Sequence, residues 1–183
     1  MTFDPAPTYG MLDTLGNLAH EIGHAWGMEH EHQRPMAWLN SDYLFEGGVS
    51  GGAAVMGAQL IDFQCQNLRD YSAIKSKNPG MIDQLCSSQV QAQFSQFSAS
   101  QILPLTGFTG IGNPLGVVQY ATDGGRFDWD SVMLYPSRVG GIPDQPPSNG
   151  DVRRPVMTRY AVGDTWGSNI APSVADVQAL NRL

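Results

Sequence analysis

Apolar residues recur at three- and four-residue steps near the beginning of the chain. The recurring residues are Leu15, Leu18, Ile22 and Trp26. This spacing places them on one stripe of an amphipathic helix. Gly27 ends the pattern, as glycine does where a helix stops in a left-handed conformation, and either Thr8 or Asp13 is a suitable N-cap. The pattern predicts a helix over about residues 12–27.

A second amphipathic pattern lies at the C-terminus. Ser173 is a suitable N-cap, and Asp176 follows in the first turn. The apolar residues expected on one face are Val174, Val177 and Leu180. The sequence therefore predicts a helix over about residues 173–183.

The middle of the chain, about residues 45–120, has no comparably clear pattern. Residues 87–101 are rich in Ser, Gln and Ala, and we interpret this stretch as a surface insertion. Phe94 and Phe97 are the residues expected to attach a short helix there to the body of the protein. Residues 136–155 are rich in Gly and Pro and are predicted to form a loop.

Composition indicates an ordinary globular protein. The 183 residues are 42% hydrophobic and 15% charged, with a net charge of −7, and this length fits one domain. The acidic balance argues against a nucleic-acid or anionic-membrane partner. No apolar stretch approaches the roughly 18 residues that a membrane span needs.

The chain has two cysteines, Cys65 and Cys86. They allow one intrachain disulfide, and two buried thiols are the alternative. Two thiols far from the histidines in sequence do not make a zinc site.

All four histidines fall between His20 and His32, in a run that begins HEIGHAWGMEH and matches HExxHxxGxxH at every specified position. On a helix, His20 and His24 project from one face, so both imidazoles can reach one metal ion. Gly27 lets the backbone turn, and His30 then supplies a third nitrogen. His32 is expected to face solvent or to make a local hydrogen bond.

Three protein ligands leave a position open for water, which is typical of catalytic rather than structural zinc. Glu21, next to His20, can reach a metal-bound water without binding the metal. A short HExxH pattern occurs by chance in helices, but the added requirements at Gly27 and His30 favour a metal site over a purely structural role.

A second motif lies about a hundred residues further along, in Ser131-Val132-Met133-Leu134-Tyr135. A methionine among apolar residues is usually part of a core. Together with the histidine motif, however, residues 131–135 look like a Met-turn, the hydrophobic floor beneath the zinc site of a metzincin.

These motifs together resemble the astacin family of zinc endopeptidases. Glu31 after the third histidine, Arg34 and Tyr135 match family positions beyond the metzincin core. The resemblance covers residues 18–34, 127–136 and, more weakly, 172–183. It is absent from about 45 to 120.

The resemblance implies an α+β fold, a metzincin (zincin-like) catalytic domain over residues 1–183. It implies one Zn²⁺ per chain, held by His20, His24 and His30, with Gly27, Glu31 and Met133 as structural support. Glu21 would act as general base towards the zinc-activated water. Tyr135 would hydrogen-bond the developing oxyanion, and the substrate would be a protein or peptide.

One departure from the family concerns its N-terminal lobe, a sheet whose edge strand pairs with the substrate. Only 19 residues precede His20, so we expect most of that lobe to be absent. The alternative hypothesis is therefore a catalytically incompetent zinc-binding remnant or interaction module. The resemblance implies an extracellular location, whereas MTFDPAPTYG has no features of a signal peptide. The sequence indicates neither the substrate specificity nor the oligomeric state.

Overall fold

Helices provide most of the regular structure in the computed structural model, which describes residues 13–34, 37–38, 59–104, 127–143 and 151–181. The α-helices are α1 (Thr14–Ala25), α2 (Tyr71–Lys77), α3 (Ile82–Leu85), α4 (Gln89–Phe94) and α5 (Val174–Leu180). Single-turn 3-10 helices are η1 (Glu31–Gln33), η3 (Cys65–Asn67) and η4 (Ser98–Gln101). No helix within these ranges is long and apolar enough to cross a membrane.

Two short strands form an antiparallel sheet, β1 (Ile61–Phe63) and β2 (Met157–Arg159). Ile61 pairs with Arg159, and Phe63 pairs with Met157. The described part of the chain thus combines helices with a small sheet, and the metzincin assignment remains a prediction.

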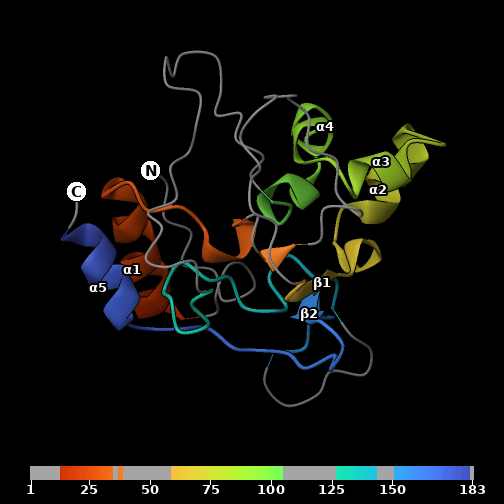
Figure 1. Cartoon of the computed structure of the whole chain (residues 1–183). Helices are drawn as coiled ribbons and strands as arrows, with labels where there is room; N and C mark the ends of the chain where they lie inside the picture. Colours follow the sequence, from red (N-terminus) through yellow and green to blue (C-terminus); the bar gives the residue numbers. More distant parts are fainter. Residues whose placement is uncertain (1–12, 35–36, 39–58, 105–126, 144–150, 182–183) are drawn as a thin grey trace.

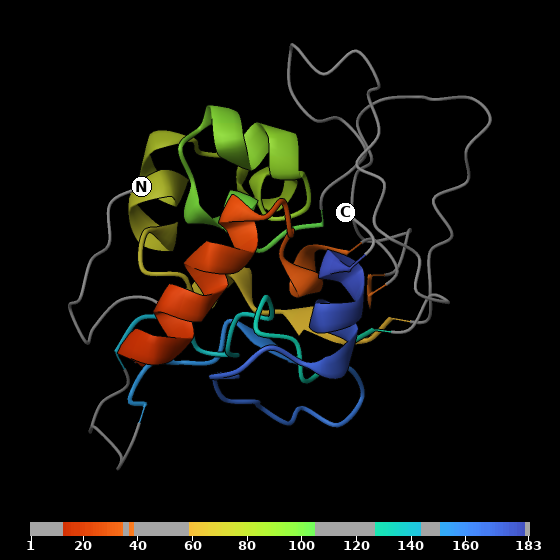
Figure 2. The same ribbon diagram turned by 90° about the vertical axis from the view of Figure 1, so that its left-hand side faces the viewer.

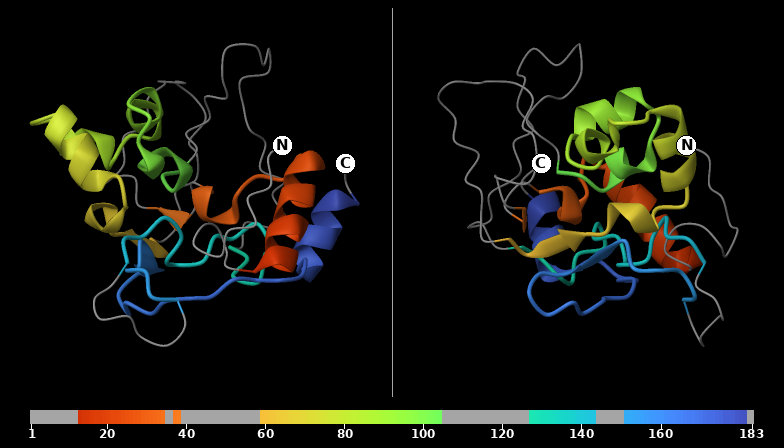
Figure 3. Two further views of the ribbon diagram at one scale, coloured as in Figure 1. Left: turned by 180° about the vertical axis from the view of Figure 1, so that it is seen from behind. Right: turned by 90° about the vertical axis from the view of Figure 1, so that its right-hand side faces the viewer.

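The helices lie at two ends of the molecule. Helices α1 and α5 are at one end, and α2, α3 and α4 are at the other, with the β1–β2 sheet (Figures 1 and 3). Figure 2 views the molecule from the α1–α5 end, with α2–α4 behind.

The hydrophobic core belongs mainly to the end with the sheet. Its largest fully buried side chains include Trp38, Ile61, Leu85, Phe97, Leu103 and Met157. A disulfide joins Cys65 of η3 to Cys86 at the end of α3, so the disulfide alternative holds in the structure.

The interpretation of residues 87–101 as a surface insertion was wrong. Ala92, Phe97 and Ala99 are buried in the core cluster, because α4 and η4 pack beside the sheet end and supply part of its apolar interior. Of the two phenylalanines expected to attach this stretch, Phe97 is 1% exposed and Phe94 is 82% exposed. Of the predicted variable region, residues 45–58 and 105–120 lie outside the described residues.

The bounds of α1 agree with the predicted helix to within about two residues at each end. Asp13 is its N-cap, accepting a hydrogen bond of 2.6 Å from the Gly16 amide at Oδ1. Thr8, the alternative cap, lies outside the described residues. Gly27 follows the helix with φ +87°, the left-handed conformation expected there.

The apolar stripe of α1, however, does not face the core. Leu15, Leu18, Ile22 and Trp26 are 39–64% exposed, whereas the buried residues of the helix are Gly16, His20 and Gly23. The inward face therefore consists of a histidine and two glycines. A Cβ on Gly23 would lie 2.5 Å from Met133 Sδ, so this face must be small to allow close packing.

Helix α5 begins as predicted, with Ser173 as N-cap and Asp176 completing a capping box. Its apolar face is also largely exposed, with Val174 at 75% and Val177 at 49%. The buried residue of α5 is Asp176, at 5%. The α1–α5 end is therefore organised around polar side chains.

Candidate metal centre

Three imidazole nitrogens converge between α1 and the segment that follows it. His20 and His24 lie one turn apart on α1, and His30 directly precedes η1. Their Nε2 atoms are 3.1 Å (His20–His24), 3.1 Å (His24–His30) and 3.0 Å (His20–His30) apart. The sequence spacing predicted this convergence, and the three residues form a group that could hold a metal ion.

The hydrogen bonds at the other ring nitrogens fix which nitrogen carries the proton. His20 Nδ1 lies 2.9 Å from the Val132 carbonyl, and His24 Nδ1 lies 2.8 Å from the Met28 carbonyl. His30 Nδ1 lies 2.7 Å from Oε1 of Gln33. Each Nδ1 must therefore donate a hydrogen, because its partner can only accept.

The three Nε2 atoms consequently have no hydrogen in the neutral rings. Their mutual distances are those of hydrogen bonds, yet no donor lies between them, so three lone pairs point at one another. A cation at their centre removes this repulsion. Nδ1–H donors that orient the rings are the usual support of histidine metal ligands.

Gln33 was not predicted from the sequence, although it orients one of the three ligands. Its amide nitrogen donates to the Ser100 carbonyl at 3.1 Å and to the Leu103 carbonyl at 2.9 Å. These two bonds direct Oε1 towards His30. The η4 region, about 70 residues away in the sequence, therefore holds His30 in place through Gln33.

The surroundings keep two of the ligands neutral. Burial lowers the pKa of His20, against the opposing effect of its bond to Val132. Burial, together with the neighbouring His32 and His20, lowers the pKa of His30 well below 6.5. Neutral imidazole is the form that binds metal, so both residues are ready to bind near neutral pH.

Tyr135 lies against the histidines, as the resemblance implied. Its ring centroid is 4.3 Å from that of His30, 4.7 Å from that of His32 and 5.2 Å from that of His20. Burial, together with the negative charge of Glu21, raises the pKa of Tyr135 to about 12. The phenol therefore stays protonated and can donate a hydrogen bond.

Glu21 is partly exposed, and it follows His20 on α1. Its charge raises the pKa of Tyr135 and favours protonation of His20. The role of Glu21 as general base remains a prediction.

The expectation that His32 faces solvent or bonds locally was wrong. His32 is 0% exposed, and its Nε2 donates to the Gln101 carbonyl at 2.9 Å. Its Nδ1 accepts a hydrogen bond of 3.4 Å from the Tyr135 amide. Burial lowers its pKa to about 3. His32 belongs to the packing behind Tyr135 and not to the metal ligands.

Met133 packs beneath α1, where Gly23 makes room for its sulfur. Met133 is 1% exposed, and its carbonyl accepts a hydrogen bond of 3.1 Å from the Glu31 amide. Met133 therefore lies against the helix that carries His20 and His24, and its role as a floor of the site remains a prediction. A glycine inside a helix lowers the stability of the helix by about 1 kcal/mol relative to alanine. The occurrence of Gly23 inside the predicted helix was therefore a signal in the sequence that this position has a packing role.

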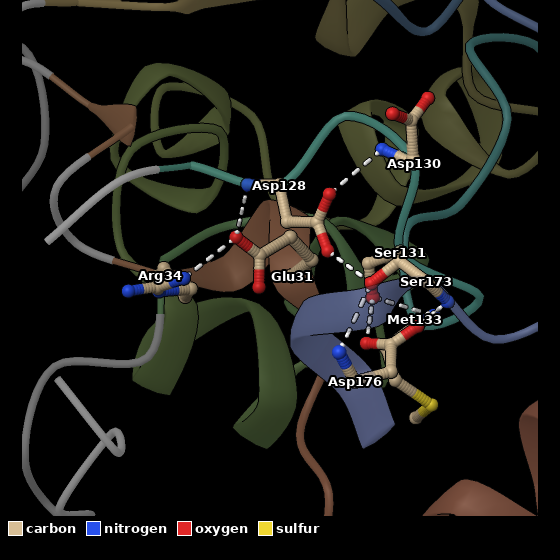
Figure 4. A network of polar contacts seen from close by, with 8 residues as sticks. All are labelled: Glu31, Arg34, Asp128, Asp130, Ser131, Met133, Ser173 and Asp176. Carbon is tan, nitrogen blue, oxygen red and sulfur yellow. Dashed lines mark hydrogen bonds and ion pairs between the residues drawn. The ribbon is translucent and has the colours of Figure 1, made fainter. Parts of the chain in front are cut away.

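A polar network joins residues 128–133 to α5 (Figure 4). The Asp176 carboxylate accepts hydrogen bonds from Ser131 Oγ at 2.7 Å, the Val132 amide at 2.9 Å and the Ser173 amide at 2.9 Å. The carbonyl of the same Val132 orients His20. Asp176 is thus two hydrogen bonds away from a metal ligand.

Glu31 connects the same network to Arg34. Its Oε1 accepts from Arg34 Nη1 at 2.7 Å and from the Asp128 amide at 2.8 Å (Figure 4). Asp128 in turn accepts a hydrogen bond of 2.5 Å from Ser173 Oγ. Burial raises the pKa of Glu31 to about 7, although the Arg34 charge opposes this shift. Glu31 therefore has a supporting role, as expected, by holding η1 against residues 127–133.

The fold and these contacts define a three-histidine site with the Tyr135 ring beside it. No protein-family model, curated protein or solved structure matches this chain. The assignment of a function therefore depends on the chemistry of the site.

Proposed function

We propose that this chain is a zinc-dependent endopeptidase. The observation that carries the proposal is the convergence of three hydrogen-free Nε2 atoms, with the Tyr135 ring against His30. Glu21 is the next residue after His20 on the same helix. A purely structural histidine cluster has no need of a partly exposed carboxylate and a protonated phenol at its side. A zinc-dependent hydrolytic site can use a carboxylate as general base and a phenol as donor to the oxyanion.

The donor set suits zinc. Three neutral imidazoles with one open position form a catalytic zinc site, and Zn–N bonds of about 2.0–2.1 Å in tetrahedral geometry need nitrogen separations of about 3.4 Å. The separations of 3.0–3.1 Å here fall short of this by a few tenths of an ångström. Small side-chain movements correct such a difference.

A zinc ion held by His20, His24 and His30 would supply a bound water with a pKa of about 7 and a Lewis acid for the peptide carbonyl. Glu21 accepts the proton of the attacking water and passes it to the leaving amine. Tyr135 stays protonated up to high pH and donates a hydrogen bond to the carbonyl oxygen as negative charge develops. His20, His24 and His30 would hold the metal, each oriented by its Nδ1 bond.

The test compares the zinc-loaded chain with Glu21→Gln on a denatured protein substrate. We expect one zinc per chain in both proteins and a loss of cleavage of about 10²–10⁴-fold in the variant, the usual contribution of a general base. Glu29→Gln, an exposed position near the end of α1, is the matched control and should cleave normally.

Two results would count against the proposal. Cleavage that persists unchanged in Glu21→Gln would remove the assigned general base. Binding of one zinc per chain without any cleavage would favour the alternative, a zinc-binding interaction module.

A further inference from the structure

The C-terminal end of α1 has the geometry of a Schellman motif, with Gly27 in the left-handed conformation at φ +87°. The Gly27 amide donates to the His24 carbonyl at 3.0 Å, and the Met28 amide donates to the Gly23 carbonyl at 3.0 Å. These are the two hydrogen bonds that define the motif. Met28 is therefore the residue that closes the helix carrying His20 and His24.

The side chain of Met28 lies against the last turns of the same helix. A Cβ on Gly23 would lie 3.5 Å from Met28 Sδ and 2.5 Å from Met133 Sδ, so both thioethers pack over this glycine. An apolar contact between the positions of Met28 and Gly23 commonly accompanies the two hydrogen bonds of a Schellman motif. The Met28 thioether thus helps to hold its own backbone at the end of α1.

The backbone of Met28 orients one of the three predicted metal ligands. Its carbonyl lies 2.8 Å from His24 Nδ1 and accepts the hydrogen of that nitrogen. This bond leaves His24 Nε2 free to bind a metal ion. A displacement of Met28 from the end of α1 would remove the acceptor, so the packing of the Met28 side chain and the metal affinity of His24 are connected.

Met28 is also accessible to solvent, unlike the sulfur beside it. Met28 is partly exposed, whereas Met133 is 1% exposed and Met157 is 0% exposed. Met81, the N-cap of α3 at the disulfide end, is 42% exposed. An oxidant in solution can therefore reach Met28 and Met81 but not the two buried methionines. Oxidation of a methionine turns a flexible apolar side chain into a polar sulfoxide and disrupts apolar packing.

We propose that Met28 is an oxidation site through which a hydroperoxide lowers the metal affinity of the chain. The sulfur lone pair attacks the terminal oxygen of the hydroperoxide, and an S–O bond forms as the O–O bond breaks. The thioether loses an electron pair and becomes a sulfoxide. The other oxygen of the hydroperoxide takes the proton and leaves as an alcohol, or as water where the oxidant is hydrogen peroxide.

The sulfoxide oxygen has no donor at Gly23, because the Gly23 amide already donates within α1. The oxidised side chain therefore turns towards solvent, and the contact that holds Met28 at the end of the helix is lost. The His24 Nδ1 hydrogen then loses its fixed acceptor. The proposal rests on the three histidines as a metal site, which is one part of the proposed function, and does not require peptide cleavage.

The test compares the zinc affinity of the zinc-loaded chain before and after treatment with hydrogen peroxide. Peptide mass spectrometry locates the oxidised residues, and a competitive chelator measures the affinity. We expect oxidation at Met28 and Met81 and a fall in zinc affinity of about tenfold or more, the usual cost of losing the outer support of a metal ligand. Methionine sulfoxide reductases A and B should restore the affinity, because they return the sulfoxide to the thioether.

Two variants locate the effect at Met28. Met28→Leu keeps an apolar side chain of similar size that peroxide does not oxidise, so its zinc affinity should not change on treatment. Met81→Leu makes the same change at the disulfide end and should lose affinity as the unaltered chain does. If Met28→Leu does not fold, a time course on the unaltered chain decides the proposal, since the loss of affinity must follow the fraction of Met28 sulfoxide.

Unchanged zinc affinity in a chain oxidised at Met28 would overturn the proposal, and so would resistance of Met28 under conditions that oxidise Met81. An equal loss of affinity in Met28→Leu would also overturn it, because another residue would then be responsible. Failure of the peptidase function is seen separately, as a chain that binds zinc and responds to peroxide but cleaves no protein. Absence of zinc binding before treatment would overturn both proposals.

Discussion

The two ends of the molecule are stabilised in different ways. At the α1–α5 end the buried side chains include His20, His30, His32, Glu31 and Asp176 beside the apolar residues 132–134, and most large apolar residues of the two helices are exposed. At the other end, apolar residues from the sheet, α2–α4 and η4 form one core cluster, crossed by the Cys65–Cys86 disulfide. Most of the buried polar network therefore belongs to the end that carries the metal ligands.

This difference has a functional consequence. An apolar core tolerates exchange among hydrophobic residues of similar size, whereas a buried polar network needs each donor and acceptor in place. We expect substitutions at the α1–α5 end to change the free energy of unfolding and the metal affinity together. Perturbations at the disulfide end should change stability alone where they leave residues 98–103 in place, because the carbonyls of Ser100 and Leu103 orient His30 through Gln33.

The largest expected effect comes from Asp176→Ala. The substitution leaves three donors, Ser131 Oγ and the amides of Val132 and Ser173, without the carboxylate they bond. We expect a loss of about 4 kcal/mol in the free energy of unfolding. Zinc affinity should also fall by about 10–100-fold, the usual cost of losing an outer support of a metal ligand, because Val132 orients His20.

Chemical denaturation and a competitive zinc chelator measure these two quantities. Asp83→Ala, at the first turn of α3, is the control at the disulfide end, and it should leave zinc affinity unchanged. An Asp176→Ala protein that loses stability but binds zinc normally would separate α5 from the metal centre and contradict the comparison.

Reduction of the Cys65–Cys86 disulfide should have the next largest effect. The bridge closes a loop with a sequence separation of 21, and loop-closure entropy predicts a loss of about 3 kcal/mol without it. The Cys65→Ser/Cys86→Ser double variant, studied by denaturation and zinc titration, tests this. Zinc affinity should stay within about twofold of the unaltered chain. A tenfold loss would mean that the two ends are coupled.

A fall from neutral to mildly acidic pH should lower the free energy of unfolding through His32, which is buried at the α1–α5 end. Its pKa is near 6.5 in an unfolded chain and about 3 in the folded protein. Between these values the unfolded state binds more protons, so the stabilisation is complete above pH 6.5 and is lost as the pH falls. Between pH 6.5 and 5 the metal-free protein should lose about 2 kcal/mol from this residue.

His32→Gln separates this contribution from that of Glu31. The pKa of Glu31 is raised to about 7, so Glu31 acts in the opposite direction, adding stability as the pH falls from 7 towards its unfolded value. Because the variant keeps Glu31, the difference between the two proteins isolates His32. The pH profiles of unfolding should converge as the pH falls, and profiles that stay parallel would contradict the assignment.

The sequence predicted those parts of the site that depend on local spacing. His20, His24, Gly27 and His30 lie within eleven residues. The period of a helix brings His20 and His24 together, and the turn at Gly27 brings His30 to them. The caps at Asp13 and Ser173 are local for the same reason. Met133 and Tyr135 lie about a hundred residues away and were found through the resemblance to a known family.

Contacts between distant segments were not predictable in this way. Gln33 is oriented by the carbonyls of Ser100 and Leu103, and Asp176 binds Ser131 and Val132. Nothing in the local pattern of a glutamine or an aspartate identifies such partners. The core at the disulfide end was missed because several of its helices span only four to seven residues, too short for a clear period.

The smallest expected effect tests the exposed stripe of α1, where the amphipathic pattern indicated the wrong face. Leu15 is 64% exposed and Leu85 is 0% exposed, so the same substitution can be compared at the two ends. Leu85→Ala leaves a cavity in the apolar core and should cost about 2–5 kcal/mol. Leu15→Ala removes little buried surface and introduces the best helix former, so its effect on the free energy of unfolding should stay within about 0.5 kcal/mol. Denaturation of both variants measures the difference in the free energy of unfolding directly.

A cost of 2 kcal/mol or more for Leu15→Ala would mean that the stripe is packed against an apolar surface in solution. The α1–α5 end would then also depend on apolar burial.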